Sequence, residues 1–295
     1  MMYKSGVVAL VGSPNVGKST LVNSLLGQKI AIVSTKPQTT RDAQRGILTT
    51  ENAQVIFVDT PGVLRPNYVL DRTMLAIARS AVQDADVVLW IVDVAKKPSN
   101  EERRIAKLIE QTNPSATVYL AMNKCDLLKP ENVINHTNIY RSLCDKAIWM
   151  LVSAKRGDNV ERVKKDIIDL MPEGPKYYEN DEITDKTVRE LSGELLRESA
   201  LYYLRHEIPH GIAVLVEEFI EKEDGKMEII ATLVVENNRH KGVVIGKNGS
   251  MIKAIGIRAR REIEKMIEQP VNLQTFVKVK ADWRNDNNQL KHMGY

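Results

Sequence analysis

The sequence lacks the features that mark disulfide-rich secreted proteins, zinc proteins and membrane-spanning proteins. Its 295 residues include only two cysteines, Cys125 and Cys144, and no histidine cluster lies near either one. This pattern excludes a disulfide framework and gives no sign of a zinc site. No apolar run approaches the roughly 18 residues that a bilayer span needs. We therefore expect a cytoplasmic protein without a spanning segment.

The chain is long, and its charge is unevenly distributed. A length of 295 residues exceeds what one hydrophobic core usually supports, so two domains are expected. Residues 173–238 contain 7 Lys/Arg against 16 Asp/Glu, a net charge of −9, whereas residues 239–265 contain 8 against 2, a net charge of +6. A basic segment of this kind indicates a contact surface for a polyanion, although a solvated lysine-rich helix face is the commoner explanation.

In the first 171 residues, short β-branched runs alternate with helical patterns. This alternation predicts an α/β domain with a mostly parallel sheet and helices on both faces. Each run is nearly all apolar, as expected of strands covered on both sides. The predicted strands are Val7–Val11, Val55–Val58, Val87–Val92, Thr117–Met122 and Ile148–Val152. Ligands bind at the carboxyl ends of such strands, and the polar motifs follow the strands directly.

A second, α+β domain is predicted after a linker. Residues 172–189 lack periodicity and contain two prolines and a glycine, so we interpret them as the interdomain linker. The domain then covers residues 190–281, and residues 282–295 are predicted as a C-terminal tail. Its expected elements are a helix over Glu190–Arg205, a hairpin of Ile212–Ile220 and Met227–Val235, and a half-buried strand over Val271–Val279.

The motif Gly12-Ser-Pro-Asn-Val-Gly-Lys-Ser19 follows the first predicted strand and precedes a helix-forming stretch. It matches the full phosphate-loop pattern, in which backbone N–H groups surround phosphate oxygens. Lys18 would meet the β and γ phosphates, and the Ser19 hydroxyl would bind magnesium. The predicted phosphate-binding residues are Gly12, Ser13, Asn15, Val16, Gly17, Lys18, Ser19 and Thr20.

A second motif, Asp59-Thr-Pro-Gly62, follows the strand Val55–Val58. The Asp59 carboxylate can hold magnesium directly or through water, and the Gly62 N–H can sense a γ-phosphate. Taken alone, the motif could be an ordinary turn. Its position beside the phosphate loop favours the nucleotide-binding role.

Two further motifs select the base. Asn123-Lys-Cys-Asp126 follows a predicted strand, and the Asp126 carboxylate can accept hydrogen bonds from N1 and N2 of guanine, an edge that adenine does not present. In Ser153-Ala-Lys155, the Ala154 N–H can meet guanine O6. The sequence therefore predicts GTP rather than ATP. The predicted base-binding residues are Asn123, Lys124, Asp126, Ser153, Ala154 and Lys155.

With these four motifs in order, residues 1–171 resemble the GTP-binding domain of translation-factor-type small GTPases. Lys36-Pro-Gln-Thr-Thr-Arg-Asp42 is similar to the first switch loop of the Era and TrmE group. The resemblance implies Thr40, with Thr39 as the adjacent alternative, as the switch threonine on Mg²⁺. The predicted metal ligands are then Ser19, Thr40 and Asp59, and the predicted catalytic residues are Lys18, Thr40, Gly62 and Asn15.

One position departs from Ras-like GTPases. Val63 stands where those proteins carry the glutamine that orients the attacking water. Because valine cannot position water, we expect slow intrinsic hydrolysis or help from another group. In related GTPases a potassium ion, held partly by the asparagine that Asn15 matches, supplies positive charge to the transition state. The resemblance thus implies K⁺ as a possible activator.

The motif Gly246-Lys-Asn-Gly249 precedes a helix that starts at Ser250. A Gly-x-x-Gly loop lets a nucleic-acid backbone approach closely, although alone it fits a helix-entry turn equally well. The surrounding order of helices and strands resembles a type II KH domain. Ile245, Ile252 and Ile255 could line a groove for bases, but Ile252 and Ile255 fit core positions at least as well. The predicted RNA-binding residues are Gly246, Lys247, Asn248, Gly249, Lys253, Arg258, Arg260 and Arg261.

A phosphate-loop GTPase domain followed by a type II KH domain is the architecture of the bacterial Era family, and the resemblance covers nearly the whole chain. It implies a GTP/GDP switch that binds single-stranded RNA near the 3′ end of small-subunit ribosomal RNA and acts in small ribosomal subunit assembly. It also implies peripheral contact with the inner membrane, of which the sequence has no independent sign, and we expect a monomer. The alternatives are a P-loop ATPase or kinase, and an RNA-binding protein that holds nucleotide as a structural ligand.

Overall fold

A computed structural model describes residues 2–34, 39–62 and 66–295. The chain forms two compact units, the first drawn mainly from residues up to Asp185 and the second mainly from Lys186 onward, and each is described by itself. The first contains a six-stranded, mostly parallel sheet, and the second contains a three-stranded sheet. The predicted α/β and α+β classes are thereby confirmed.

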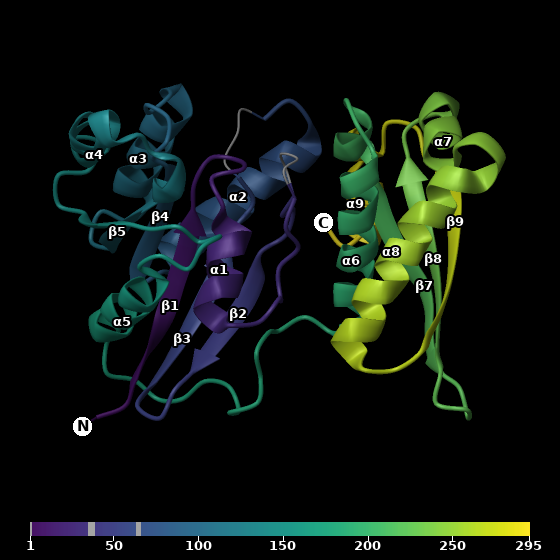
Figure 1. The fold of residues 1–295 in the computed structure, drawn as a ribbon, viewed down its shortest axis with the longest axis horizontal. Helices are drawn as coiled ribbons and strands as arrows, with labels where there is room; N and C mark the ends of the chain where they lie inside the picture. The colour runs from purple at the N-terminus through teal and green to yellow at the C-terminus, as the bar shows by residue number, and fades with distance from the viewer. Residues whose placement is uncertain (1, 35–38, 63–65) are drawn as a thin grey trace. The chain divides into compact units, whose positions relative to one another are not determined.

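The sheet of the first unit has the strand order β2-β3-β1-β4-β5-β6 (Figure 1). All neighbouring strands run parallel except β2 and β3, which are antiparallel. The strands are β1 (Lys4–Val11), β2 (Gln44–Thr49), β3 (Ala53–Asp59), β4 (Val87–Asp93), β5 (Thr117–Asn123) and β6 (Ile148–Leu151). The helices in this part of the chain are α1 (Lys18–Leu26), α2 (Val69–Gln83), α3 (Asn100–Thr112), α4 (Val133–Arg141) and α5 (Val160–Leu170).

Helices cover both faces of this sheet. Val8 and Leu10 of β1 belong to a core cluster shared with α1 and α5. Ala9 and Val11, which alternate with them, belong to a second cluster shared with α2, α3 and α4. Because both faces of β1 are buried, its sequence is a continuous apolar run. The strand order also reverses at β1, and this reversal is where open α/β sheets bind ligands.

The structure contains one strand that the sequence analysis did not predict. β2 pairs with β3 along its length and is an edge strand of the six-stranded sheet, and Gly46 also forms an isolated bridge to Thr184. Its exposed Arg45 and the following Gly46 interrupt the apolar pattern that reveals the other strands. The strands β4 and β5 also continue one residue further than predicted, to Asp93 and Asn123, because backbone pairing does not stop where side chains become polar.

The segment predicted as a linker is bonded to the first unit over most of its length. Ser5 N donates to Pro172 O at 3.0 Å, and Ile47 N donates to Ile183 O at 2.9 Å. The Gln54 side chain accepts from the backbone N–H groups of Tyr177 and Tyr178. The next helix begins at Val188, two residues before the predicted start, because Thr187 caps it.

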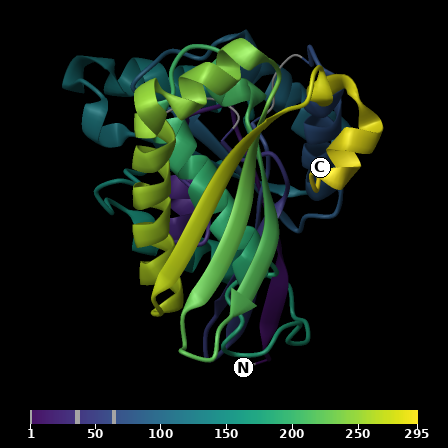
Figure 2. The same cartoon turned by 90° about the vertical axis from the view of Figure 1, so that its right-hand side faces the viewer.

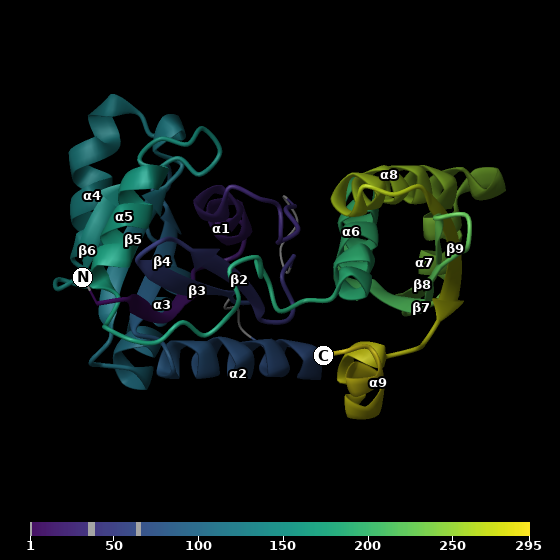
Figure 3. The same ribbon diagram turned by 90° about the horizontal axis from the view of Figure 1, so that it is seen from below.

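In the second unit, β7 pairs antiparallel with β8, and β8 pairs parallel with β9. Helices α6 and α8 lie on one side of this sheet (Figure 3). The other side of the sheet faces the viewer in Figure 2. The helices are α6 (Val188–Tyr203), α7 (Asn238–Ile245), α8 (Ser250–Ile267) and α9 (Asn287–His292). The strands are β7 (Ala213–Glu221), β8 (Met227–Val235) and β9 (Val271–Val279).

The last fourteen residues, predicted as a tail, form part of the second unit. Trp283 is fully buried, and its indole N–H donates to Gly211 O at 3.1 Å. Asp286 caps α9 by accepting from the backbone N–H of Asn288, and Leu290 of α9 is buried. An isolated tryptophan in a polar segment gives no periodic signal, so the sequence pattern did not reveal this anchor.

Candidate nucleotide site and nucleic-acid interface

The predicted nucleotide motifs meet at one edge of the parallel sheet. Leu10 at the end of β1 is in register with Asp59 at the end of β3, and Asp93 at the end of β4 is in register with Asn123 at the end of β5. The phosphate loop directly follows β1. The carboxyl ends of four adjacent strands therefore surround the loop, as a nucleotide site in an open α/β sheet requires.

The phosphate loop is closely packed against its neighbours. A Cβ atom on Gly12 would lie 2.3 Å from Ile91 O, and one on Gly17, which has a φ of +103°, would lie 2.3 Å from Asn123 Nδ2. Both positions therefore require glycine. The buried Lys18 Nζ donates to Gly12 O at 3.1 Å and to Ser13 O at 3.4 Å. Its ammonium group thus lies inside the loop that would hold the phosphates.

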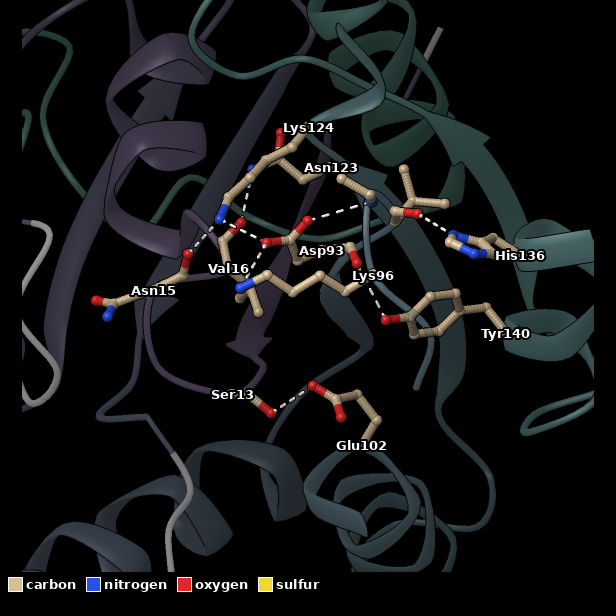
Figure 4. A network of polar contacts seen from close by, with 12 residues as sticks. Ser13, Asn15, Val16, Asp93, Lys96, Glu102, Asn123, Lys124, His136 and Tyr140 are labelled. Carbon is tan, nitrogen blue, oxygen red and sulfur yellow. Dashed lines mark hydrogen bonds and ion pairs between the residues drawn. The ribbon is translucent and has the colours of Figure 1, made fainter. Parts of the chain in front are cut away.

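Two residues of the base motif hold this loop. Asn123 Nδ2 donates to Val16 O at 2.7 Å, and Lys124 Nζ donates to Asn15 O at 2.7 Å (Figure 4). Asn123 Oδ1 in turn accepts from Ala154 N at 2.9 Å. One asparagine side chain therefore connects the phosphate loop to the Ser153–Lys155 motif. The Ala154 N–H, predicted to meet guanine O6, donates to Asn123 in this structure.

The three predicted metal ligands lie together. Asp59 Oδ2 accepts from Ser19 Oγ at 2.8 Å and from Thr40 Oγ1 at 3.2 Å, and the two hydroxyl oxygens are 3.1 Å apart. Asp59 Oδ1 is buried and has no hydrogen-bond partner among the described residues. One carboxylate and two hydroxyl oxygens are ligands that Mg²⁺ accepts. The donor set and the unpartnered carboxylate oxygen therefore fit a magnesium ion.

Lys18 and Asp59 are both fully buried and interact with each other. Burial raises the pKa of Asp59, and the charge of Lys18 and the hydroxyls of Ser19 and Thr40 offset part of that rise. Burial lowers the pKa of Lys18, while Asp59 acts in the opposite direction. An anionic nucleotide would favour the charged form of Lys18, and a cation on Asp59 would favour the charged form of that carboxyl group.

The other predicted nucleotide-binding residues differ in their burial and in their hydrogen bonds. Asp126 is partly buried, and no hydrogen bond to its carboxylate is found among the described residues, so the carboxylate can accept from a base. Ser153 is buried, and its N–H donates to Asp158 O at 3.0 Å. Lys155 is exposed, and Thr20 is partly buried within α1. Lys124 has a φ of +62°, which turns the chain sharply after β5.

Two buried carboxylates that sequence reasoning missed contact this site. Asp93 Oδ2 lies 2.8 Å from Lys124 Nζ, and Glu102 Oε1 accepts from Ser13 Oγ at 2.8 Å (Figure 4). Asp93 follows a predicted strand, which is the signal that identified Asp59, so the same reasoning could have found it. Glu102 belongs to a helix start 89 residues from Ser13, and no sequence pattern links the two.

Some predicted switch residues lie outside the described residues, namely Lys36, Pro37, Gln38 and Val63. Among the described ones, Asn15 is exposed and has a φ of +63°. No hydrogen bond of its side-chain amide is found in the described part of the chain. Gly62 is partly buried, and a Cβ atom there would lie 3.0 Å from Pro14 Cγ, so this glycine lies against the phosphate loop.

The Gly-x-x-Gly motif of the second unit forms a tight turn between α7 and α8. Gly246 has a φ of +72°, and a Cβ atom there would lie 2.7 Å from Met251 Cβ. Asn248 and Gly249 also have positive φ values, of +53° and +75°. Lys247 and Asn248 are exposed at the tip of this turn. The turn therefore presents its backbone and one cation without a covering side chain.

The basic residues after the turn do not all lie on one side of α8. Gly256 faces Thr275 of β9, whereas the guanidinium carbon of Arg258 lies 4.1 Å from the ring centroid of Tyr202 on α6. Arg258 therefore lies on the α6 side. Lys253, Arg260 and Arg261 are exposed. Ile255 is fully buried and Ile252 is partly buried in the same core, which favours the packing interpretation for Ile255.

Comparisons with known proteins agree with these motifs. The family model described as a 50S ribosome-binding GTPase matches residues 7–124, and the model described as a KH domain matches residues 207–284. GTPase Era of Ruminiclostridium cellulolyticum is 40% identical over 295 residues, which covers 100% of this chain and 98% of that protein. The chain belongs to the Era GTPase family. GTPase Era of Lactobacillus delbrueckii subsp. bulgaricus is 43% identical over 293 residues, covering 99% of this chain and 96% of the relative.

Solved Era structures match over the same extent. One, an Era complex with MgGDPNP and nucleotides 1506–1542 of 16S ribosomal RNA, has a TM-score of 0.95 at 36% identity and covers 99% of both chains. Another, an Aquifex aeolicus Era variant bound to GDP·AlF4⁻, has a TM-score of 0.94 at 35% identity and also covers 99% of both chains. As an Era-family member, the chain is a GTPase, and the ATPase or kinase alternative is set aside.

Proposed function

We propose that the first unit binds and hydrolyses GTP with Mg²⁺, and that the second binds single-stranded RNA near the 3′ end of small-subunit ribosomal RNA. The nucleotide state would determine how tightly the RNA is held, and the cycle would act in assembly of the small ribosomal subunit. The solved Era complex with MgGDPNP and a segment of 16S ribosomal RNA supports both halves of this proposal.

The observation that carries the nucleotide half is the connection between the phosphate loop and the base motif. Val16 O and Asn15 O accept from Asn123 and Lys124, so the loop that would hold phosphates is bonded to the segment that ends at Asp126. A single guanosine nucleotide would span the two. An adenine nucleotide would leave the partly buried Asp126 carboxylate without its donors, which costs binding free energy.

In this proposal, Ser19, Thr40 and Asp59 hold the magnesium ion. When bound, the ion neutralises charge on the β and γ phosphate oxygens. Lys18 adds a second positive charge inside the loop, and the Gly62 N–H meets the γ-phosphate. Binding of the γ-phosphate would thus hold the segments that carry Thr40 and Gly62, and its loss would release them.

We also propose that potassium accelerates hydrolysis and that Asn15 provides one of its ligands. The side chain of Asn15 is exposed beside the phosphate loop, and its carbonyl oxygen suits a monovalent cation. Phosphate release measured in matched potassium and sodium salts tests this step. Equal rates in the two salts, or an unchanged potassium response in Asn15→Ala, would refute it.

The RNA half rests on the turn Gly246–Gly249 and the basic residues around it. The exposed Lys247 at a helix N-terminus suits a phosphate, and the uncovered glycines allow a nucleic-acid backbone to approach. Lys253, Arg260 and Arg261 extend the positive charge along α8. Arg258 takes part in the proposal as a neighbour of the exposed Tyr202 ring rather than of the turn.

Cellular location and assembly complete the proposal. No helix among the described residues has both the length and the apolar character of a membrane span. We propose a cytoplasmic monomer, with peripheral inner-membrane contact as a prediction from the family resemblance alone. Sedimentation of the purified protein tests the monomer, and flotation with phospholipid vesicles tests the membrane contact.

The deciding experiment replaces Asp126 by asparagine, which removes the charge and turns one of the two acceptor oxygens into an N–H donor. The affinity for GTP should fall by about two orders of magnitude, because one hydrogen bond to a charged group is lost and the other becomes a bond to a neutral group, while the affinity for xanthosine triphosphate rises. The exposed carboxylate Asp145, changed to asparagine, is the matched control. An unchanged preference for GTP would refute the proposed site. Multiple-turnover phosphate release by the wild type excludes a merely structural nucleotide.

A further inference from the structure

One contact to the phosphate loop comes from a helix that carries none of the nucleotide motifs. The hydroxyl of Ser13 donates to Glu102 Oε1 at 2.8 Å, and both side chains are buried (Figure 4). Glu102 lies in the first turn of α3, which follows β4. The contact therefore joins α3 to the second residue of the phosphate loop.

The same carboxylate also begins the helix. Ser99 caps α3, and Glu102 Oε2 accepts from Ser99 N at 2.8 Å and from Ser99 Oγ at 2.5 Å, which is a capping box. A capping box uses one oxygen of the carboxylate. The other oxygen, Oε1, accepts the hydrogen bond from Ser13. The carboxylate that caps the start of α3 therefore also orients a residue of the phosphate loop.

The charge on Glu102 fixes the direction of the hydrogen bond between Ser13 and Glu102. Burial alone would raise the pKa of Glu102, but hydrogen bonds from Ser99 and Ser13 outweigh it and leave the pKa below its usual value. An ionised carboxylate only accepts hydrogen bonds, so the Ser13 hydroxyl must donate to it. The hydroxyl proton is thereby directed at Glu102.

Ser13 is coupled to the rest of the loop through its carbonyl. Lys18 Nζ donates to both Gly12 O and Ser13 O, so a rotation of the Gly12–Ser13 segment would move the acceptors of the buried ammonium group. Asn123 and Lys124 hold the loop at Val16 and Asn15, on the far side of Pro14. Glu102 holds the first part of the loop from outside the phosphate-loop motif.

We propose that Glu102 is a positioning residue for GTP binding and hydrolysis, acting through the Ser13 hydroxyl to hold the first half of the phosphate loop in its binding geometry. The inference rests on the proposed nucleotide-binding role of that loop. It adds a residue on α3 that neither the motifs nor the magnesium ligands include.

Four variants test it: Glu102→Gln, Ser13→Ala, the two combined, and Ser99→Ala. The readouts are the dissociation rate of a fluorescent GDP analogue, kcat and KM for GTP, and the Tm. Glu102→Gln and Ser13→Ala should each raise the dissociation rate about tenfold, the worth of a hydrogen bond to a charged group. The double variant should release the GDP analogue no faster than Glu102→Gln does, because both changes remove the same contact.

Ser99→Ala is the comparison variant, since it removes the Ser99 hydroxyl from Glu102 but keeps Ser13, Glu102 and the Ser99 N–H that holds the carboxylate. It should lower the Tm and raise the dissociation rate by less than Glu102→Gln does. The proposal is overturned if Ser99→Ala raises the dissociation rate as much as Glu102→Gln, if the two effects multiply in the double variant, or if Ser13→Ala leaves the rate unchanged. A wild-type protein without a preference for guanine nucleotides would instead refute the proposed function.

Discussion

The ammonium group of Lys124 lies between the Asp93 carboxylate and the Asn15 carbonyl, at 2.8 and 2.7 Å. Asp93 is itself fixed, because its Oδ1 accepts from Ala95 N and its carbonyl accepts from Tyr140 Oη at 3.1 Å. The side-chain exposure of Asp93 is 12%, so water competes little for this ion pair. Lys124 therefore reaches the phosphate loop as part of a partly buried charged pair.

Asp93→Asn should weaken the interaction with Lys124 while keeping a side chain of the same size and shape. We expect the affinity for GTP and for GDP to fall together by about tenfold, since one charge-assisted hydrogen bond becomes a neutral one. Calorimetric titration with both nucleotides measures the change. Lys96→Ala is the control, because Lys96 lies 3.9 Å from the same carboxylate, is 80% exposed and should contribute little. A loss confined to GTP would contradict this account.

Single residues also show where sequence reasoning stops. Asp59 and Asn123 were predicted because each follows an apolar strand at the sheet edge where ligands bind. The identity of each group predicted its chemistry, but not its partners. Ala154 N–H, expected to meet a base, donates to Asn123, and Glu102 contacts Ser13 from far along the chain. Such contacts depend on packing, which local patterns do not encode.

At the scale of elements, α6 begins with a capping box whose contribution to stability should depend on pH. Glu190 Oε2 accepts from Thr187 N at 2.8 Å and Thr187 Oγ1 at 2.7 Å. Burial acts to raise the pKa of Glu190, but these bonds and Lys186 lower it below the usual value of 4.5. A lowered folded-state pKa means that the stabilisation is complete above about pH 4.5 and is lost as the pH falls through the lowered value.

Glu190→Gln should therefore lower the free energy of unfolding of the second unit by about 0.5 kcal/mol at pH 7, because glutamine can keep the capping box but loses the charge that favours a helix N-terminus. The difference from wild type should shrink as the pH falls below about 4.5, because protonated Glu190 resembles glutamine. Urea unfolding followed by circular dichroism at pH 7 and pH 4 measures both values. Glu207→Gln, at an exposed site, should show no such pH dependence. A difference that persists unchanged at pH 4 would count against the cap.

Elements with strong periodicity were predicted, and those held by long-range pairing were not. β9 follows the alternating pattern closely, and the order of elements around the Gly-x-x-Gly turn agrees with the prediction. β2 forms because β3 offers it a pairing edge, and residues 172–185 follow the first unit because it supplies their hydrogen-bond partners. Backbone pairing of this kind needs no periodic pattern of apolar residues in the segment.

Over the whole molecule, the acidic tract at residues 173–238 and the basic segment at residues 239–265 belong to different parts of the fold. Much of the acidic charge lies in the segment bonded to the first unit and in the β7–β8 hairpin. The basic charge lies on α7, the Gly-x-x-Gly turn and α8. A polyanion would therefore meet the positive part of the second unit, and its affinity should depend on salt.

Reversing the charge at the turn with Lys247→Asp should weaken binding of a single-stranded RNA from the 3′ end of small-subunit ribosomal RNA. It should also reduce the slope of log affinity against log salt by about 0.7, the value for one lost phosphate contact on a single strand. Lys226→Asp in the β7–β8 turn carries the same charge change and should leave the RNA affinity unchanged. GTP affinity should be unchanged in both variants.

Wild-type RNA affinity, measured at matched salt with a non-hydrolysable GTP analogue and then with GDP, tests whether the two units communicate. If the nucleotide shifts the RNA affinity by a factor, the RNA must shift the relative affinity for the two nucleotides by the same factor, because binding free energies are reciprocal. Measuring both sides gives one coupling value from two independent titrations. Equal RNA affinities in the two states would leave a GTPase and an RNA-binding module on one chain without a switch between them.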